Sequence, residues 1–113
     1  MHEASIARQL VTAAIAQGHK NGARKITRIA GWVAETETLS KESITMQAAA
    51  QAVGSIAEGA VIDLDVFHVE ARCSTCGEVY RPEHHLLLCP KCGGTDAALL
   101  REVGIGVRAL DVE

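Results

Sequence analysis

The chain has 113 residues, of which 48% are hydrophobic and 22% are charged, and its formal net charge is −3. This length allows one compact domain, or a small domain combined with a metal-stapled module. The acidic balance gives no general attraction to nucleic acid or to an anionic membrane, no apolar run approaches the roughly 20 residues that span a bilayer, and the lack of a secretory signal predicts a cytoplasmic protein.

Two amphipathic helices are predicted from a period of about 3.6 residues. The first covers residues 4–17 and ends before Gly18. The second follows the N-cap candidate Ser40, runs to about Val53 and ends at Gly54. The positions expected on the buried faces are Ile6, Leu10, Ala13, Ala14 and Ile15 in the first helix, and Ile44, Ala48 and Ala52 in the second. Met46 is expected to fill the core.

Three strands are predicted. Residues 24–35 are rich in β-branched side chains, whereas residues 61–69 and 103–112 alternate between apolar and polar or small side chains. A single terminal strand needs a sheet to join, so we expect the last strand to pair with the strands that precede the cysteines. The cysteine segment then becomes an insertion in one small α+β domain.

Four cysteines form two Cys-x-x-Cys pairs, Cys73 with Cys76 and Cys89 with Cys92, and each pair is followed by glycine. This pattern is typical of a structural zinc site, because four thiolates complete a tetrahedron and leave no open position for catalysis. Disulfides are the first alternative, but they need an oxidising compartment. A redox pair is the second, but it needs only one Cys-x-x-Cys. A zinc enzyme is disfavoured for want of an open ligand position.

The residues Met1, His2 and Glu3 have the donors of a square-planar metal site. The α-amine, the deprotonated His2 amide and the His2 imidazole can close two chelate rings, and the Glu3 amide or carboxylate can supply a fourth donor. Nitrogen and oxygen donors in this geometry suit Ni²⁺ or Cu²⁺. Taken alone, a histidine at position 2 is more often a solvated terminal residue.

Several segments together resemble the HypA/HybF family of hydrogenase nickel-incorporation proteins over the whole length of the chain. In chain order they are residues 1–7 (MHEASIA), 21–26 (NGARKI), 42–44 (ESI), 54–60 (GSIAEGA), the two cysteine pairs with their glycines, and 109–113 (ALDVE). No single segment is decisive, but their joint order is specific.

The resemblance implies a non-enzymatic nickel metallochaperone. Its expected fold is a nickel-binding α/β domain of two helices on a roughly three-stranded sheet (residues 1–70 and 103–113) with an inserted zinc-ribbon, rubredoxin-knuckle-like domain (residues 71–102). The implied nickel ligands are Met1, His2 and Glu3, and the implied zinc ligands are Cys73, Cys76, Cys89 and Cys92. The implied partners are a HypB-type GTPase, the [NiFe]-hydrogenase large subunit and, in some bacteria, urease maturation proteins, with no nucleic acid or membrane.

The chain departs from the family pattern between residues 34 and 48. Residues 34–38 read Ala-Glu-Thr-Glu-Thr in place of a Gly-Glu-Leu-Ser-Gly-like segment, and Met46 and Ala48 stand at positions that are usually aromatic. These changes bear on helix packing and on the partner surface but not on the expected metal ligands. The adjacent His84 and His85 could hold a labile second metal, although a solvated loop is the simpler interpretation. The alternative function is a zinc-ribbon adaptor that binds a protein partner and no nickel.

Overall fold

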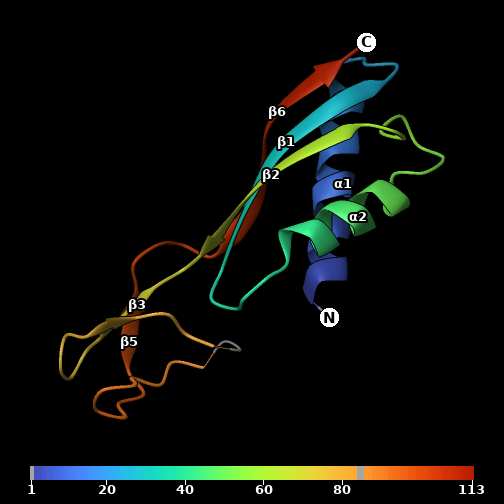
Figure 1. Ribbon diagram of the computed structural model, residues 1–113. Helices are drawn as coiled ribbons and strands as arrows, with labels where there is room; N and C mark the ends of the chain where they lie inside the picture. The colour runs from blue at the N-terminus through green and yellow to red at the C-terminus, as the bar shows by residue number, and fades with distance from the viewer. Residues whose placement is uncertain (1, 84–85) are drawn as a thin grey trace. The chain divides into compact units, whose positions relative to one another are not determined.

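A computed structural model describes residues 2–83 and 86–113, with only the backbone of His2 (Figure 1). Within these ranges no helix is long and apolar enough to span a bilayer. The chain divides into two compact units: the first comprises Met1–Val33, Ser40–Val66 and Ile105–Glu113, and the second comprises Ala34–Leu39 and Phe67–Gly104. The elements in chain order are α1 (His2–Lys20), β1 (Ile26–Glu35), α2 (Lys41–Gln51), β2 (Val61–His68), β3 (Ala71–Cys73), β4 (Val79–Tyr80), β5 (Ala97–Leu99) and β6 (Gly104–Val112).

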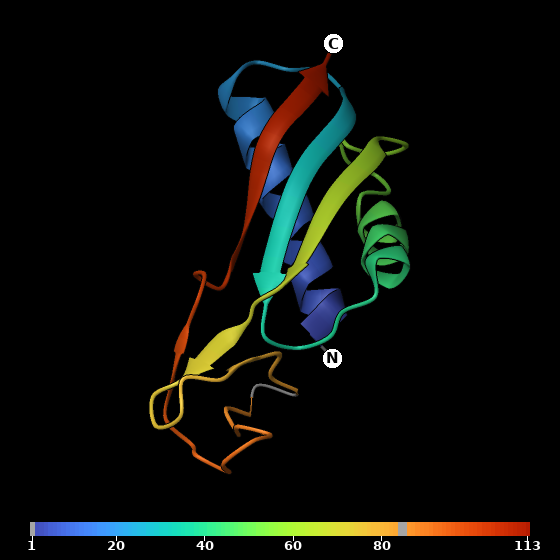
Figure 2. The same cartoon turned by 60° about the vertical axis from the view of Figure 1, so that its left-hand side comes forward.

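The first unit is built on a three-stranded sheet in the order β2-β1-β6. Figure 2 shows the arrows of β1 and β2 pointing the same way and that of β6 pointing the opposite way. Beyond the end of β6, the Glu113 amide donates to the Lys25 carbonyl at 2.8 Å, and the Lys25 amide donates back at 3.3 Å. The terminal strand therefore pairs with a strand that precedes the cysteines, as predicted.

The side chains of β2 alternate between a buried face and an exposed face of this sheet. Leu64 is fully buried, whereas Asp63 and Asp65 are exposed, which confirms the alternation read from the sequence. On the exposed face, Arg28 of β1 donates to Asp63 at 2.6 Å and Arg108 of β6 forms an ion pair with Asp65. The polar positions of all three strands therefore lie on one surface, which leaves the other face free for the helices.

The two helices pack on that other face (Figures 1 and 2). In α1 the buried hydrophobic residues are Ile6, Ala7, Leu10, Val11 and Ala14. The expectation for Ala13 was wrong, since it is exposed, and Ile15 is only half-buried. Ala7 and Val11 lie one turn apart on the true buried stripe, which is turned slightly from the predicted one.

The second helix begins and packs as expected. The Ser43 amide donates to the Ser40 hydroxyl at 3.1 Å, so Ser40 is the N-cap. Ile44, Ala48 and the C-cap Ala52 are all buried. Met46 is 69% exposed, so the expectation that it fills the core was wrong. It lies two residues from Ile44, which turns it to the opposite side of the helix.

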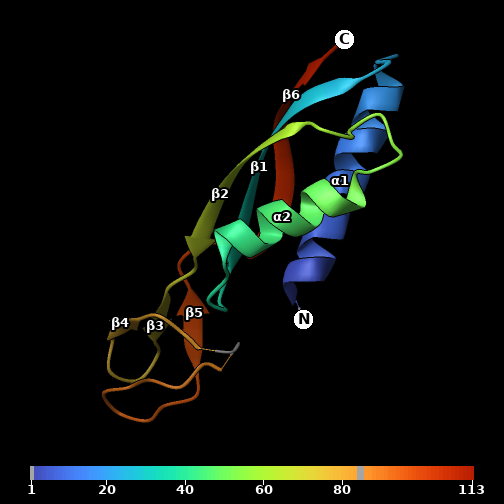
Figure 3. The same ribbon diagram turned by 45° about the vertical axis from the view of Figure 1, so that its right-hand side comes forward.

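The second unit contains a small antiparallel sheet in the order β4-β3-β5 (Figure 3). Ala71 lies opposite Tyr80 on β4 and opposite Leu99 on β5, and Cys73 lies opposite Ala97. The buried cluster of this sheet consists of Ala71, Cys73, Tyr80 and Cys89, with Leu87 and Ala97 packed against it. So small an apolar core contributes little burial energy, and two of its four buried members are cysteines.

Candidate metal centre

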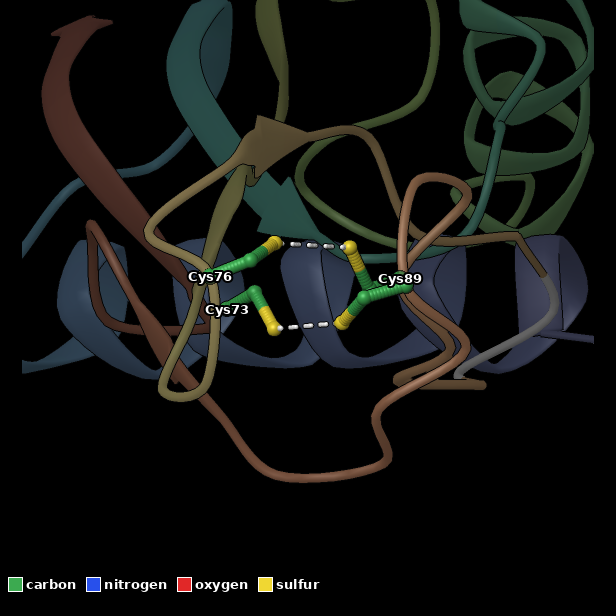
Figure 4. A group of neighbouring side chains, drawn as sticks. Cys73, Cys76 and Cys89 are labelled. Carbon is green, nitrogen blue, oxygen red and sulfur yellow. Dashed lines mark hydrogen bonds between the residues drawn. The ribbon is translucent and has the colours of Figure 1, made fainter.

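The four cysteines converge in the second unit. Cys73 is the last residue of β3, Cys76 lies in the turn that follows, and Cys89 and Cys92 lie on a second turn. Their Sγ atoms all lie within 4.8 Å of one another. The Sγ atoms of Cys73 and Cys92 are 3.5 Å apart, and those of Cys76 and Cys89 are 3.6 Å apart (Figure 4). The sequence spacing therefore predicted the cluster correctly.

The sulfur positions fit a tetrahedral metal ion. A tetrahedron with Zn–S bonds of about 2.3 Å places its sulfurs roughly 3.8 Å apart, close to the spacing seen here. A disulfide needs about 2.05 Å, and all four cysteines are free. With four sulfur donors the shell is closed, which suits a structural ion rather than a catalytic one.

The two cysteine turns are built alike. The Gly77 amide donates to the Cys73 carbonyl at 3.0 Å, and the Gly93 amide donates to the Cys89 carbonyl at 2.9 Å. Both glycines have a positive φ, 79° and 75°, which a side chain would strain. The Gly94 amide then points at the Cys92 sulfur, 3.4 Å away. Each Cys-x-x-Cys-Gly segment is thus a preformed turn that presents sulfurs to a common centre.

The thiols in the cluster titrate unequally. Hydrogen bonds from the backbone amides of Cys76 and Thr75 are the main cause that lowers the pKa of Cys73 to about 6. The Gly94 amide by itself would lower the pKa of Cys92, but hydrogen bonds with the Cys73 and Cys76 sulfurs, together with burial, raise it to about 12. Without a bound cation some of the cysteine thiols stay protonated. Four thiolates at this spacing therefore require a compensating positive charge.

The predicted N-terminal ligands belong to the first unit. Met1 and the His2 side chain lie outside the described residues, while the His2 backbone begins α1. The Glu3 carboxylate accepts a hydrogen bond from the Ser40 amide at 2.6 Å. The sequence identified Ser40 as a cap but not as this donor, because 37 positions separate the two residues.

The α2 helix holds the first turn of α1 at a second point. The Gln51 side-chain amide, at the far end of α2, donates to the Ala4 carbonyl at 3.2 Å. Contacts from both ends of α2 therefore restrain the turn that carries Glu3.

The histidines outside the N-terminus are not gathered into a site, as far as they are described. His68 contacts the Pro82 carbonyl through Nε2 at 2.8 Å, and His19 is exposed near the end of α1. The pair His84 and His85, considered as a labile metal site, lies outside the described residues.

Tyr80 is a residue of the second unit that sequence reasoning did not single out. Its side chain is buried, and its hydroxyl has no hydrogen-bond partner in the described chain. Burial raises the pKa of the Tyr80 phenol, and the negative charges of Cys73, Cys89 and Cys92 raise it further. The only sequence signal was its place four residues after Cys76, in the short strand that follows the first cysteine turn.

Comparison with solved structures shows the same fold in two HypA proteins. The solution structure of the Ni metallochaperone HypA from Helicobacter pylori superimposes with a TM-score of 0.63 at 21% identity, over 97% of this chain and 96% of that one. A second HypA solution structure gives a TM-score of 0.60 at 23% identity, over 100% and 97% of the two chains. The expected α+β fold of two helices and small sheets is thereby confirmed.

Sequence comparison gives the family. A hydrogenase maturation factor HypA from Rhodobacter capsulatus is 33% identical over the whole chain and 98% of its own length, and one from Dehalococcoides mccartyi is 29% identical over the whole chain and 95% of its own. The matching family model, which covers residues 1–112, is described as hydrogenase/urease nickel incorporation, metallochaperone, hypA. That description is of a metal-delivery factor and not of an enzyme, as expected. The chain belongs to the HypA family of nickel-incorporation metallochaperones.

Proposed function

We propose that this protein binds Ni²⁺ through Met1, His2 and Glu3 and delivers it during the maturation of [NiFe]-hydrogenase. The observation that carries the proposal is the family match over residues 1–112, in a chain that starts with the donor set Met-His-Glu. An amine, an amide nitrogen and an imidazole form the planar nitrogen-rich environment that Ni²⁺ prefers. Nickel is cargo here, so the site must release the ion as well as hold it.

The start of α1 supports this role for the N-terminal residues. Since α1 begins at His2, the amides of His2 and Glu3 lie in the first helical turn, where backbone N–H groups lack intrahelical acceptors. A metal ion can therefore replace the proton of such an amide, which leaves to solvent, without breaking a helical hydrogen bond. One oxygen of the Glu3 carboxylate is engaged by Ser40, so the Glu3 side chain also ties the nickel site to α2.

We further propose that the ion held by Cys73, Cys76, Cys89 and Cys92 is zinc. The all-sulfur donor set and the tetrahedral spacing of the sulfurs both suit Zn²⁺. Bound there, the ion supplies the charge that four thiolates require and cross-links the two cysteine turns. Its role is structural, because no coordination position is left for a substrate.

Membership of a maturation family implies contact with the hydrogenase maturation machinery. Within it we propose a HypB-type GTPase and the [NiFe]-hydrogenase large subunit as the direct partners, in the cytoplasm. Urease maturation proteins are a second set of partners, favoured by the family description, which names both enzymes.

The deciding experiment is a calorimetric Ni²⁺ titration of tag-free protein that begins at Met1, with bound zinc measured in parallel. We expect His2→Ala to lose tight nickel binding, because the imidazole and its chelate ring disappear, while one zinc per chain remains. His19→Ala is the matched control, since it removes an exposed histidine from the other end of the same helix.

Unchanged nickel affinity in His2→Ala would rule out the N-terminal site. If the unaltered protein binds one zinc and no nickel, the remaining function is that of a zinc-ribbon adaptor for a protein partner.

A further inference from the structure

The first turn of α1 is the part of that helix that its own backbone holds least. The first four N–H groups of a helix have no intrahelical acceptor, so a helix start frays unless other groups hold it. Because α1 begins at His2, the nickel donors proposed above come from this turn or from the residue directly before it in sequence. Whatever holds the turn in place therefore bears on nickel binding.

Two hydrogen bonds from α2 hold this turn. The Ser40 backbone amide donates to the Glu3 carboxylate at 2.6 Å, and the Gln51 side-chain amide donates to the Ala4 carbonyl at 3.2 Å. The two donor residues stand at opposite ends of α2, about 16 Å apart at the rise of a helix. Bonds from points so far apart restrain the orientation of the turn as well as its position.

The α2 helix is itself fixed to the core of the first unit. Its residues Ile44 and Ala48 and its C-cap residue Ala52 are buried, and α2 packs against α1 (Figure 3). A hydrogen bond from α2 therefore connects the start of α1 to a packed element and not to a mobile surface group.

The two hydrogen bonds differ in how they relate to the metal. The Glu3 carboxylate is itself a candidate nickel donor, so an arriving ion can compete with the Ser40 amide for it. Ala4 supplies no donor to the proposed site, so the bond from Gln51 faces no such competition. The Gln51 side chain is exposed, so it adds little to the packing of α2. Its contact with α1 is the hydrogen bond that can persist while nickel is bound and released.

We propose that Gln51 is a positioning residue of the nickel site, which it serves by holding the Ala4 carbonyl. This inference rests on the N-terminal nickel site proposed above. Gln51 supplies no ligand. It orders the turn before the metal arrives, which reduces the conformational freedom that chelation has to remove and so strengthens binding.

Gln51→Leu tests the proposal, because it removes the donor and keeps a helix-forming side chain of similar size. Gln47→Leu is the matched control, since Gln47 lies one turn earlier on α2 and donates to the Ser43 hydroxyl of the same helix at 3.1 Å. The full tag-free chain that begins at Met1 is titrated with Ni²⁺. We expect nickel affinity to fall about fivefold in Gln51→Leu, the usual effect of one lost hydrogen bond, and to stay unchanged in Gln47→Leu.

Backbone order parameters from nuclear magnetic resonance separate positioning from a general loss of stability. In the nickel-free protein the amides of Glu3 and Ala4 should become more mobile in Gln51→Leu only. The urea midpoint followed by Trp32 fluorescence should be the same in the two variants. Unchanged nickel affinity in Gln51→Leu overturns the proposal. Weaker nickel binding without greater mobility of Glu3 and Ala4, or an equal loss in Gln47→Leu, overturns it too.

The His2→Ala variant shows which proposal has failed. If His2→Ala loses tight nickel binding while Gln51→Leu keeps it, only the role of Gln51 is wrong. If His2→Ala binds nickel as tightly as the unaltered protein, the N-terminal site is wrong, and the role of Gln51 falls with it.

Discussion

At the scale of single residues, a close approach between β6 and β1 of the first unit depends on a missing side chain. A Cβ placed on Gly106 of β6 would lie 2.6 Å from Nε1 of Trp32 on β1. No real Cβ tolerates that distance, so the indole occupies the space that any other residue at 106 would need. The sequence shows a glycine in a strand, which signals close approach, but it does not show what approaches.

Gly106→Ala should therefore destabilise the first unit by about 1–3 kcal/mol, because the indole or the strand must shift. The measurement is urea unfolding followed by far-ultraviolet circular dichroism. In a Trp32→Leu background the same change should be neutral or stabilising, since alanine suits a strand better than glycine. Equal losses in both backgrounds would show that the indole is not the obstacle.

At the scale of elements, α2 links the fold to the proposed nickel site. The hydroxyl of its N-cap residue Ser40 accepts a hydrogen bond from the Ser43 amide. The backbone amide of Ser40 donates a hydrogen bond to the Glu3 carboxylate. The buried side of α2 is small, with Ile44 as its only large member, so local capping contributes a sizeable share of its stability.

Ser40→Ala should cost about 1 kcal/mol of unfolding free energy, the usual effect of losing an N-cap side chain. The backbone amide that binds Glu3 remains, so nickel affinity should change little. Trp32, the only tryptophan in the sequence, reports unfolding of the first unit by fluorescence. Ser40→Asn is the control, because asparagine caps equally well and should restore stability. A large loss of nickel affinity in Ser40→Ala would contradict the inference that the Ser40 side chain only caps α2 while its backbone amide alone binds Glu3.

At the scale of the whole molecule, the two units depend on different forces. The first unit buries aliphatic residues of α1, α2 and the larger sheet, whereas the second has a cluster of four buried residues that includes two cysteines. Burial energy grows with apolar area, so we expect the second unit to need a bound metal ion to fold, and the first unit to fold without one.

Removing the metal with a strong chelator should unfold the second unit alone. We expect the helical circular dichroism and the Trp32 fluorescence to persist, while amide resonances of residues 71–99 lose their dispersion. Cys89→Ser should produce the same pattern without a chelator, because it removes one of the four sulfurs. Persistent dispersion in the metal-free second unit would contradict a structural role for the ion.

The sequence by itself determined the features that depend on near neighbours in the chain. These are the period-two strand around Leu64, the Ser40 cap, the glycines that close the cysteine turns, and the Cys-x-x-Cys pairs. Each follows from stereochemistry within a few residues, so a single chain without a structure is sufficient to predict it. The family resemblance rests on the same local segments in their order.

Only the tertiary structure decided which side of an element meets the core and which distant groups meet each other. Met46 turned outward and Ala13 was exposed because the buried stripe of a helix depends on what packs against it. The Glu3–Ser40 hydrogen bond and the orphaned Tyr80 hydroxyl likewise arise between segments far apart in sequence. The periodicity of a segment narrows the residues that can face the core. Which distant residues come into contact is decided by the packing of the whole chain.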